Sequence, residues 1–284
     1  TSCFTPKAIQ LLKKIYNQEN PKNKINRRLP KNILREIQSH PKLQCGSDEC
    51  IIDKVTTNKR SKNMLKALLF PPTKPEHWER EPNSWLSNFD IMDVLNQYEK
   101  SYEDFMFVGP SSINYDTELY PNVFVCRKLR EFNLAKCLQR TPQITKIGII
   151  FNLSPHDKKG SHWVAMFINL IDNFIFYFNS SGNPIPQNIN KFANIVKHQA
   201  KSLNPSKQLE FYQNTNIEHQ KSNTECGMYC LYFIITMLLQ KKEIQYDMNG
   251  GNTEILSKGD LFSLFKNKRI SEKFVSDKRK EYFS

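Results

Sequence analysis

Four polar residues in the second half of the chain carry side chains that together can break an amide bond. In chain order they are His162, Asn179, Gln220 and Cys226. Attack by a thiol needs a general base, the base needs an orienting partner, and the developing oxyanion needs a hydrogen-bond donor. The imidazole, the carboxamide of Asn179 and the carboxamide of Gln220 meet these three needs in turn. The four residue types therefore predict a cysteine protease.

The nucleophile of this set is expected at the start of a helix. Cys226 is followed by an apolar run over residues 228–239, and Asn223 and Thr224 precede it as capping residues would. A helix N-terminus carries about half a positive charge, which lowers the pKa of a thiol placed there. Cys230, one turn further inside the apolar run, is expected to be inert. The alternative is that Cys226 is a core thiol, and its partner residues are what favour chemistry.

The base and its orienting partner are expected at adjoining ends of a β-hairpin. Apolar segments over residues 162–170 and 173–179 are separated by a short turn, which predicts two antiparallel strands. Such a hairpin brings His162 and Asn179 side by side, so that the carboxamide can orient the imidazole. Asn179 can equally be an ordinary residue of the polar turn that follows it. Gln220 can donate to the oxyanion together with the backbone N–H of Cys226.

The elements around these residues alternate between strand and helix. Apolar segments over residues 147–153 and 208–213 predict further strands, and shorter strands or connectors are expected over 105–108 and 123–126. A capping-box pattern at Ser87 predicts a helix, and two more are expected over 187–203 and 226–240. The last is apolar on all faces, as a helix packed centrally against a sheet would be. These elements predict an α+β fold.

The N-terminal part of the chain has a different character. Residues 1–80 are expected to form a basic, mainly helical accessory domain, and residues 81–284 the protease core. Helices are predicted near Pro6 and Pro30, and the segment from Pro71 to Pro82 is expected to run extended over a surface. Cys45 and Cys50 could share a metal ion, but no second pair has a matching spacing. A tight turn with one inward thiol is favoured, and no metal is predicted.

Composition limits the remaining classes of protein. The net charge of +13 and pI near 9.3 suggest an acidic partner such as nucleic acid, although solubility alone also explains them. The seven cysteines are an odd number in a chain of 284 residues and do not predict a disulfide scaffold, so a reducing compartment is expected. No signal peptide or membrane span is predicted. The basic tail over residues 266–280 is expected to be a solvated helix face.

The order and spacing of these motifs resemble a known superfamily. The His162-Trp163 pair, Asn179 at the end of the next strand and the Gln-x5-Cys-Gly motif from Gln220 are similar to the SUMO/ubiquitin-like protease and adenovirus protease superfamily. Longer matching stretches cover residues 160–165, 177–183 and 220–227. Many cellular members have Asp at the position of Asn179, and the Asn points to maturation proteases of large cytoplasmic DNA viruses such as African swine fever virus.

The resemblance implies a central mixed β-sheet between helices, a helical N-terminal accessory region, and no metal or organic cofactor. It implies cleavage after small residues, commonly Gly-Gly, with Trp163 covering a narrow substrate tunnel; Trp163 can also be core packing. The implied location is the host cytoplasm, at viral assembly sites, and the virion.

Three functions remain open from the sequence. The first is a virion maturation endopeptidase that cuts Gly-Gly-containing core or capsid polyproteins. The second is a deubiquitinase or deSUMOylase acting on host ubiquitin-like conjugates. The third is a basic nucleic-acid-binding core protein whose active site has lapsed, which the intact set of four residues argues against. Non-specific nucleic-acid contact through the basic surface is compatible with all three.

Overall fold

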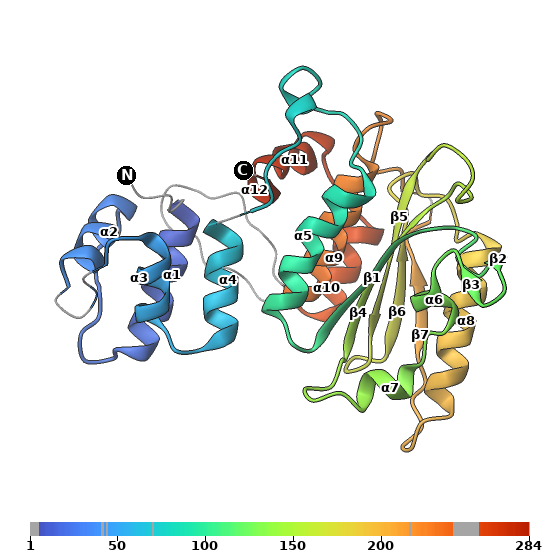
Figure 1. The fold of residues 1–284 in the computed structure, drawn as a ribbon, viewed down its shortest axis with the longest axis horizontal. Coiled ribbons are helices and arrows are strands. Elements are labelled where there is room, and N and C mark those ends of the chain that lie inside the picture. The colour runs from blue at the N-terminus through green and yellow to red at the C-terminus, as the bar shows by residue number, and fades with distance from the viewer. Residues whose placement is uncertain are drawn as a thin grey trace.

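The computed structural model describes residues 6–40, 43, 45–69, 71–215, 217–240 and 256–283. It confirms the α+β fold: a five-stranded mixed sheet lies between two layers of helices, and a separate group of helices extends from one side (Figure 1). The strands are β1 (Phe105–Ser112), β4 (Lys146–Asn152), β5 (Trp163–Asn169), β6 (Phe174–Phe178) and β7 (Glu210–Gln213), with β2 (Glu118–Tyr120) and β3 (Val123–Phe124) forming a small hairpin.

Helices precede, separate and follow these strands. Before the sheet come α1 (Pro6–Glu19), α2 (Pro30–Ser39), α3 (Asp48–Val55), α4 (Lys59–Leu69), the 3-10 turn η2 (Glu76–Glu79) and α5 (Asn88–Ser101). Within and after it come α6 (Arg127–Arg130), α7 (Leu134–Leu138), α8 (Gln187–Lys201), α9 (Cys226–Leu239), α10 (Lys258–Lys266), α11 (Glu272–Asp277) and α12 (Arg279–Tyr282).

The strand order of the large sheet is β1-β4-β5-β6-β7. Strand β5 is antiparallel to both β4 and β6. At the two edges of the sheet, β1 is parallel to β4 and β7 is parallel to β6. The predicted hairpin is therefore confirmed as β5 and β6. Its turn is closed by Asn169, whose Oδ1 accepts the backbone N–H groups of Ile171 and Asp172 at 2.9 Å each. This side-chain closure holds the two strands in one register.

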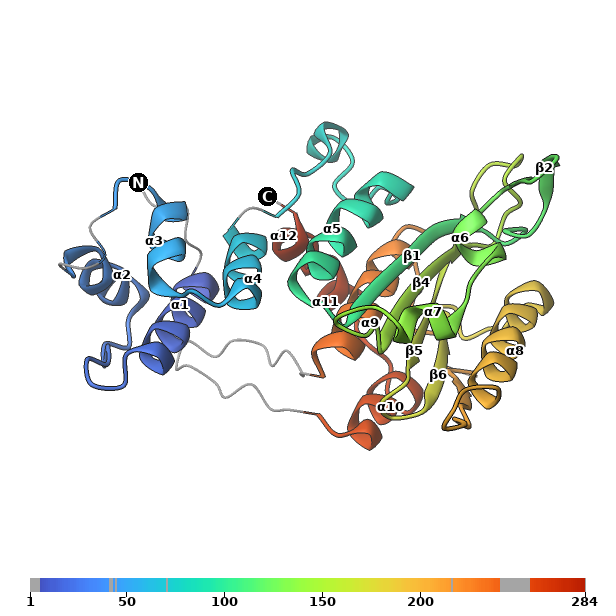
Figure 2. The same cartoon turned by 60° about the horizontal axis from the view of Figure 1, so that its bottom comes forward.

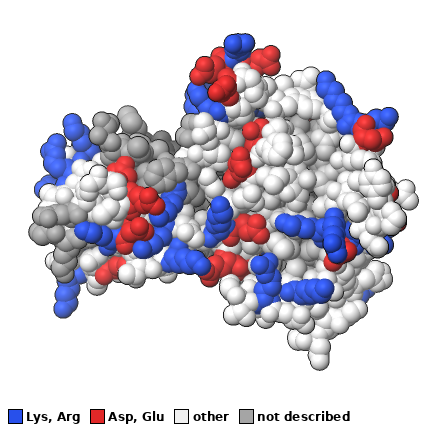
Figure 3. Space-filling model, in the orientation of Figure 1, with Lys and Arg blue, Asp and Glu red and all other residues white. Residues whose placement is uncertain are grey.

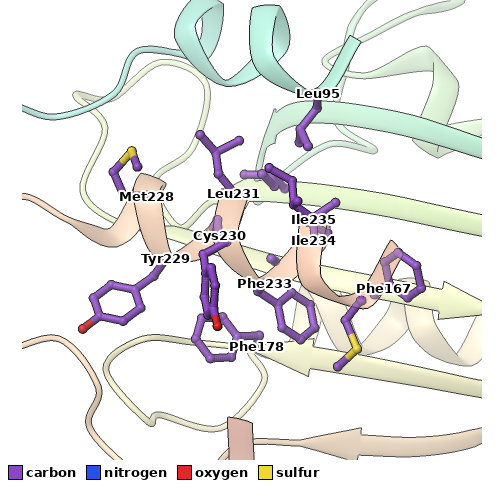
Figure 4. Packing of buried hydrophobic residues seen from close by; sticks show 14 of the residues in the cluster. Leu95, Phe167, Phe178, Met228, Tyr229, Cys230, Leu231, Phe233, Ile234 and Ile235 are labelled. Carbon is purple, nitrogen blue, oxygen red and sulfur yellow. The ribbon is translucent and has the colours of Figure 1, made fainter. Parts of the chain in front are cut away.

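Each face of the sheet buries its own apolar cluster. Helices α5, α9 and α10 cover one face, and α6, α7 and α8 cover the other (Figures 1 and 2). Helix α9 is buried from Cys226 to Leu238, which confirms the central helix expected from its composition. Figure 4 shows Phe233, Ile234 and Ile235 of α9 among the apolar side chains between α5 and the sheet. A helix with no solvent face holds its first residue firmly in place.

The N-terminal helices have an apolar cluster of their own, built from α1 to α4. Helices α1 and α2 confirm the predictions, but α3 and α4 were not expected. Their signals were present: Ser47 accepts the N–H of Cys50 as an N-cap, and Asn58 accepts the N–H of Ser61. Charged residues surround both caps, and neither segment was expected to form a helix. The domain boundary near residue 80 stays a prediction.

Two interpretations of the N-terminal half are wrong. Cys45 and Cys50 form a disulfide that closes the turn before α3, whereas a single inward thiol was expected. The five-residue separation places the two sulfurs within reach once Ser47 starts the helix. The segment from Pro71 to Pro82 is not extended throughout, because η2 buries Trp78 against Phe283 near the end of the chain.

The basic tail is also more deeply packed than predicted. Val275 and Arg279 are buried, whereas a solvated helix face was expected for this segment. Among the described residues, no helix is long and apolar enough to cross a membrane. The same residues include no group of three or more His, Cys, Asp or Glu side chains that could hold a metal ion.

Candidate active site

His162 and Asn179 meet at the open end of the β5–β6 hairpin. His162 immediately precedes β5, and Asn179 immediately follows β6. The distance between His162 Nε2 and Asn179 Oδ1 is 2.9 Å. The same Oδ1 accepts the backbone N–H of Ser181 at 3.0 Å, so it is an acceptor and Nε2 of the imidazole carries the proton. The other ring nitrogen, Nδ1, is left free to take a proton from a nucleophile.

The backbone of Asn179 is fixed by a residue far away in the sequence. Asn214 is fully buried and forms two hydrogen bonds with this backbone: its Oδ1 accepts the Asn179 N–H, and its Nδ2 donates to the Asn179 carbonyl, each at 2.8 Å. The side-chain amide thus continues the parallel pairing of β6 and β7 by one step. Asn214 was not singled out in the sequence, where nothing distinguishes it from other loop asparagines.

The turn after Asn179 docks on the segment that carries Gln220. Gly182 has a φ of +69°, and a Cβ at this position would lie 2.6 Å from the carbonyl oxygen of Ile217. Only glycine allows this approach of the two backbones. The carbonyl of Ser180 accepts the N–H groups of His219 and Gln220 at 2.8 and 3.0 Å. Residues 40 positions apart in the chain are thereby brought to one site.

Gln220 is held by hydrogen bonds on both sides of its carboxamide. Its Oε1 accepts the hydroxyl of buried Ser180 at 2.8 Å, and its Nε2 donates to the carbonyl of Ser222 at 2.8 Å. One of the two hydrogens on Nε2 is used in this way, and the second remains for an oxyanion. Ser180, which also was not predicted, fixes which end of the carboxamide donates.

Cys226 begins α9, as predicted, and is 1% exposed. The backbone N–H groups of Trp163, Cys226 and Gly227 lie in hydrogen-bonding range of its sulfur. Since Trp163 directly follows His162, the thiol and the imidazole belong to one site. The expected caps are wrong, because Glu225 occupies the N-cap position and no described side chain caps the helix. The first N–H groups of α9 therefore face the thiol instead of a capping side chain.

The protonation of the site differs from the expectation for an isolated helix end. Burial raises the pKa of the Cys226 thiol above 9.0, and the surrounding backbone N–H groups offset this only in part. Burial also lowers the pKa of His162 below 6.5, against the opposing effect of its hydrogen bond with Asn179. The predicted lowering of the pKa of the Cys226 thiol is therefore wrong, because the effect of burial is larger than that of the surrounding N–H groups. Both directions favour the neutral thiol and the neutral imidazole in this structure.

Trp163 is packed beside the nucleophile and is 8% exposed. Its indole N–H donates to the carbonyl of Leu86 at 3.0 Å. Leu86 in turn lies over the start of α9, where a Cβ on Gly227 would come within 2.9 Å of the Leu86 Cβ. The segment before α5 is thus a wall of the site, which the sequence analysis missed. Whether Trp163 contacts substrate stays a prediction.

Comparison with known proteins places these residues in a family. Residues 127–278 match the model of the Ulp1 protease family, C-terminal catalytic domain. The chain belongs to the Ulp1 protease family. His162, Asn179, Gln220 and Cys226 all lie within the matched residues. The chain is accordingly a cysteine protease by family, as the resemblance of its motifs indicated.

Several relatives of this Ulp1-family chain are viral. A protein of Acanthamoeba polyphaga mimivirus that carries the name of a thiol protease is 28% identical over 257 residues, covering 84% of this chain and 80% of the mimivirus protein. A cysteine protease of African swine fever virus is 26% identical over 230 residues, covering 74% of this chain and 79% of its own length.

A solved structure supports the same fold. The crystal structure of the African swine fever virus protease has a TM-score of 0.55 and 22% identity, and covers 89% of this chain and 88% of the viral protease. The similarity therefore extends beyond the family match into the N-terminal region, which the Ulp1 family model does not include.

Proposed function

We propose that this Ulp1-family chain is an endopeptidase that cleaves after Gly-Gly in viral core or capsid polyproteins during virion maturation. The observation that supports catalysis most directly is the 2.9 Å contact between His162 and Asn179 beside the thiol of Cys226. The relatedness to proteases of two large DNA viruses supports the viral setting. In this proposal the enzyme works at assembly sites in the host cytoplasm and within the virion.

The proposed reaction uses the four predicted residues in named roles. The Cys226 sulfur attacks the scissile carbonyl carbon while Nδ1 of His162 takes the thiol proton. Asn179 keeps Nε2–H oriented, so that Nδ1 is the basic nitrogen. The Gln220 amide and the backbone N–H of Cys226 donate to the oxyanion. His162 then protonates the leaving amine, and water hydrolyses the acyl-enzyme without a metal or organic cofactor.

The preference for glycine is supported by the tight packing around Cys226. Leu86 accepts a hydrogen bond from Trp163 and lies against Gly227, which has no room for a Cβ. A substrate strand that passes between these groups can carry little side-chain volume near the scissile bond. Gly-Gly satisfies this condition, and Trp163 is the proposed wall of the substrate tunnel.

A comparison of substrates tests the substrate class. The purified chain is given a capsid polyprotein with Gly-Gly-Xaa sites and, separately, ubiquitin and SUMO conjugates, and kcat/KM is measured for each. Preferred cleavage of the polyprotein supports the proposal. Preferred cleavage of the conjugates would replace it with the second candidate, a deubiquitinase or deSUMOylase. That candidate is favoured by the Ulp1 family match and by viral relatives named SUMO-1 cysteine protease.

The basic N-terminal helices are proposed to hold nucleic acid or an anionic assembling particle while the core cuts. Lys62 and Lys66 of α4 are paired with Asp53 and Glu49 inside this region. Figure 3 shows Lys and Arg side chains both at the left edge of the molecule and over the part to its right. The exposed basic residues of the N-terminal region include four on the loop between α1 and α2, of which Arg27 is paired with Glu36. These four are Lys22, Lys24, Arg27 and Arg28.

A salt series tests this tether. Attraction between exposed charges is screened within roughly 8–10 Å at physiological ionic strength. Cleavage of the large polyprotein should therefore fall with added salt, while cleavage of a short neutral peptide stays constant. Replacing Lys22, Lys24 and Arg28 with Gln should remove the difference, and Lys62→Gln, whose charge is already paired, is the control. Parallel salt curves for both substrates would remove the idea of a tether.

A further inference from the structure

The loop that carries Gln220 has no regular structure of its own. Residues 217–225 connect β7 to α9, and they place the proposed oxyanion donor and the nucleophile. The carbonyl of Ser180 accepts two N–H groups of this loop, and side chains from elsewhere hold the rest of it. Most of those side chains come from the C-terminal segment, residues 265–279.

The first contact is made by Glu272, at the start of α11. Its carboxylate accepts the backbone N–H of Lys221 at 2.9 Å and the N–H of Ser222 at 3.1 Å. Ser222 is the residue whose carbonyl accepts from Gln220 Nε2. Glu272 therefore holds the backbone N–H of Ser222, the residue whose carbonyl, in the next peptide unit, accepts from the Gln220 amide. Desolvation raises the pKa of Glu272, but the hydrogen bonds from Ser222 and Lys221 outweigh it and leave the pKa lowered, so the group is a charged acceptor.

The second contact is an ion pair directly beside the nucleophile. Glu225 and Arg279 are both buried, and Arg279 Nε and Nη2 each lie 3.2 Å from a carboxylate oxygen of Glu225. The carbonyl of Glu225 accepts the N–H of Tyr229, the first hydrogen bond of α9. Arg279 Nη2 also donates to the carbonyl of Ser84 at 2.8 Å, next to the wall formed by Leu86. One guanidinium thus ties the start of α9 to this wall.

The third contact fixes the other end of the loop. The ring of buried His219 lies between the Phe265 carbonyl, 3.0 Å from Nε2, and the Ile270 N–H, 3.1 Å from Nδ1. Arg269 Nε donates to the His219 carbonyl at 3.1 Å. His219 thus acts as a structural link, and Gln220 is the first residue beyond it.

We propose that Glu272 and Arg279 are positioning residues for the oxyanion site, so that the C-terminal helices set the rate of the chemical step. This inference rests on the proposed function. Neither residue touches the reacting atoms; each acts through the backbone of Ser222 or Glu225. Displacement of the Gln220 amide or of the Cys226 N–H weakens stabilisation of the transition state more than binding of the ground state.

The test compares Glu272→Gln with Asp277→Asn, which changes an exposed carboxylate of the same helix. Hydrolysis of a Gly-Gly peptide amide is measured in both variants. Glu272→Gln should lower kcat roughly 10-fold with KM changed less than about twofold, because one oxyanion donor is displaced without being removed. Asp277→Asn should resemble the unmodified chain. Arg279→Lys, which keeps the charge but not the two-nitrogen contact, should lower kcat, and Lys280→Gln is its exposed control.

A transition-state analogue separates positioning from a purely structural role. A peptide aldehyde bonds its carbonyl carbon to the Cys226 sulfur, the thiol proton moves to His162, and the carbonyl oxygen becomes the oxyanion. The matched peptide alcohol cannot react. Glu272→Gln should weaken aldehyde binding by the same factor as kcat and leave alcohol binding unchanged.

Three results would overturn the inference: equal kcat for Glu272→Gln and Asp277→Asn, equal loss of aldehyde and alcohol binding, or a loss of rate that follows unfolding. The proposed function fails separately, if Cys226→Ala retains turnover.

Discussion

The two halves of the active site are built in different ways. His162 and Asn179 lie at the ends of adjacent strands, and the backbone ladder of β5 and β6 brings them together. Gln220 lies on a loop held by groups from residues 265–279 and by Ser180, and Cys226 follows this loop at the start of the buried helix α9. The first half uses strand ends, with Asn214 fixing the Asn179 backbone, whereas the second uses charged and polar groups about 50 residues away. Rigidity of an active site thus does not require that its residues lie on regular elements.

The largest expected effect comes from removing a reacting group in either half. Cys226→Ala and His162→Ala should each lower kcat/KM by roughly 10⁴-fold or more, because the nucleophile or its base is lost. Both variants should stay folded, with melting temperatures near that of the unmodified chain by circular dichroism. Cys126→Ala, which removes another free thiol, is the control. Substantial turnover by Cys226→Ala would place the nucleophile elsewhere.

The next effect compares the two halves of the active site by the unfolding free energy that is lost when one side chain of each half is replaced. Arg279→Met leaves the Glu225 carboxylate buried without its partner, and this should cost about 3–5 kcal/mol of unfolding free energy. In the strand-built half, Asn214→Ala removes two hydrogen bonds from the Asn179 backbone and should cost about 1–3 kcal/mol. Urea unfolding measures both.

The double variant Glu225→Gln with Arg279→Met should recover part of the loss, because no charge is then left unpaired. Equal costs for Arg279→Met and Asn214→Ala would remove the distinction between the two halves.

A smaller effect is expected from the orienting carboxamide. Asn179→Ala should lower kcat/KM by about 10²-fold, less than His162→Ala, because the base itself remains. Asn179→Asp should be tolerated, since a carboxylate oxygen can accept the same hydrogen bond from His162. Asn183→Ala, in the same turn, is the control. If Asn179→Ala, Asn179→Asp and His162→Ala are equally inactive, the main role of Asn179 is to hold the turn through Ser181.

The smallest effect is expected in the pH profile of kcat/KM. This profile tests whether the Cys226 proton moves to His162 only during the reaction. Below the lowered pKa of His162 the base is protonated, and above the raised pKa of Cys226 no proton remains for the leaving amine. The value of kcat/KM should therefore be flat across neutral pH, with the acid limb below the ordinary pKa of an imidazole and the alkaline limb above the ordinary pKa of a thiol. A preformed thiolate would instead place the acid limb near about pH 4. Thiolate absorbance at about pH 7, measured against Cys226→Ala, should be absent.

The misses in the fold have a common cause. Ser47 and Asn58 had the residue types of helix caps, yet no helix was predicted after either of them. Arg279 lies in a basic run that is typical of a solvated surface, and only the packing against Trp78 and Glu225 shows that it is buried. A charged side chain gives no local signal for its distant partner, because the partner lies outside any window of the sequence.

The sequence by itself determined the α+β fold, the central sheet, the hairpin that pairs His162 with Asn179, and the apolar helix that begins at Cys226. Periodicity and turn chemistry act over a few residues, so these features could be read directly. Only the tertiary structure decided the protonation of the site and which residues keep the loop of Gln220 in place. The thiol pKa depends on how deeply Cys226 is buried, and the orientation of Gln220 depends on Ser180, 40 residues away. Both are set by the packing of distant segments, which local patterns do not record.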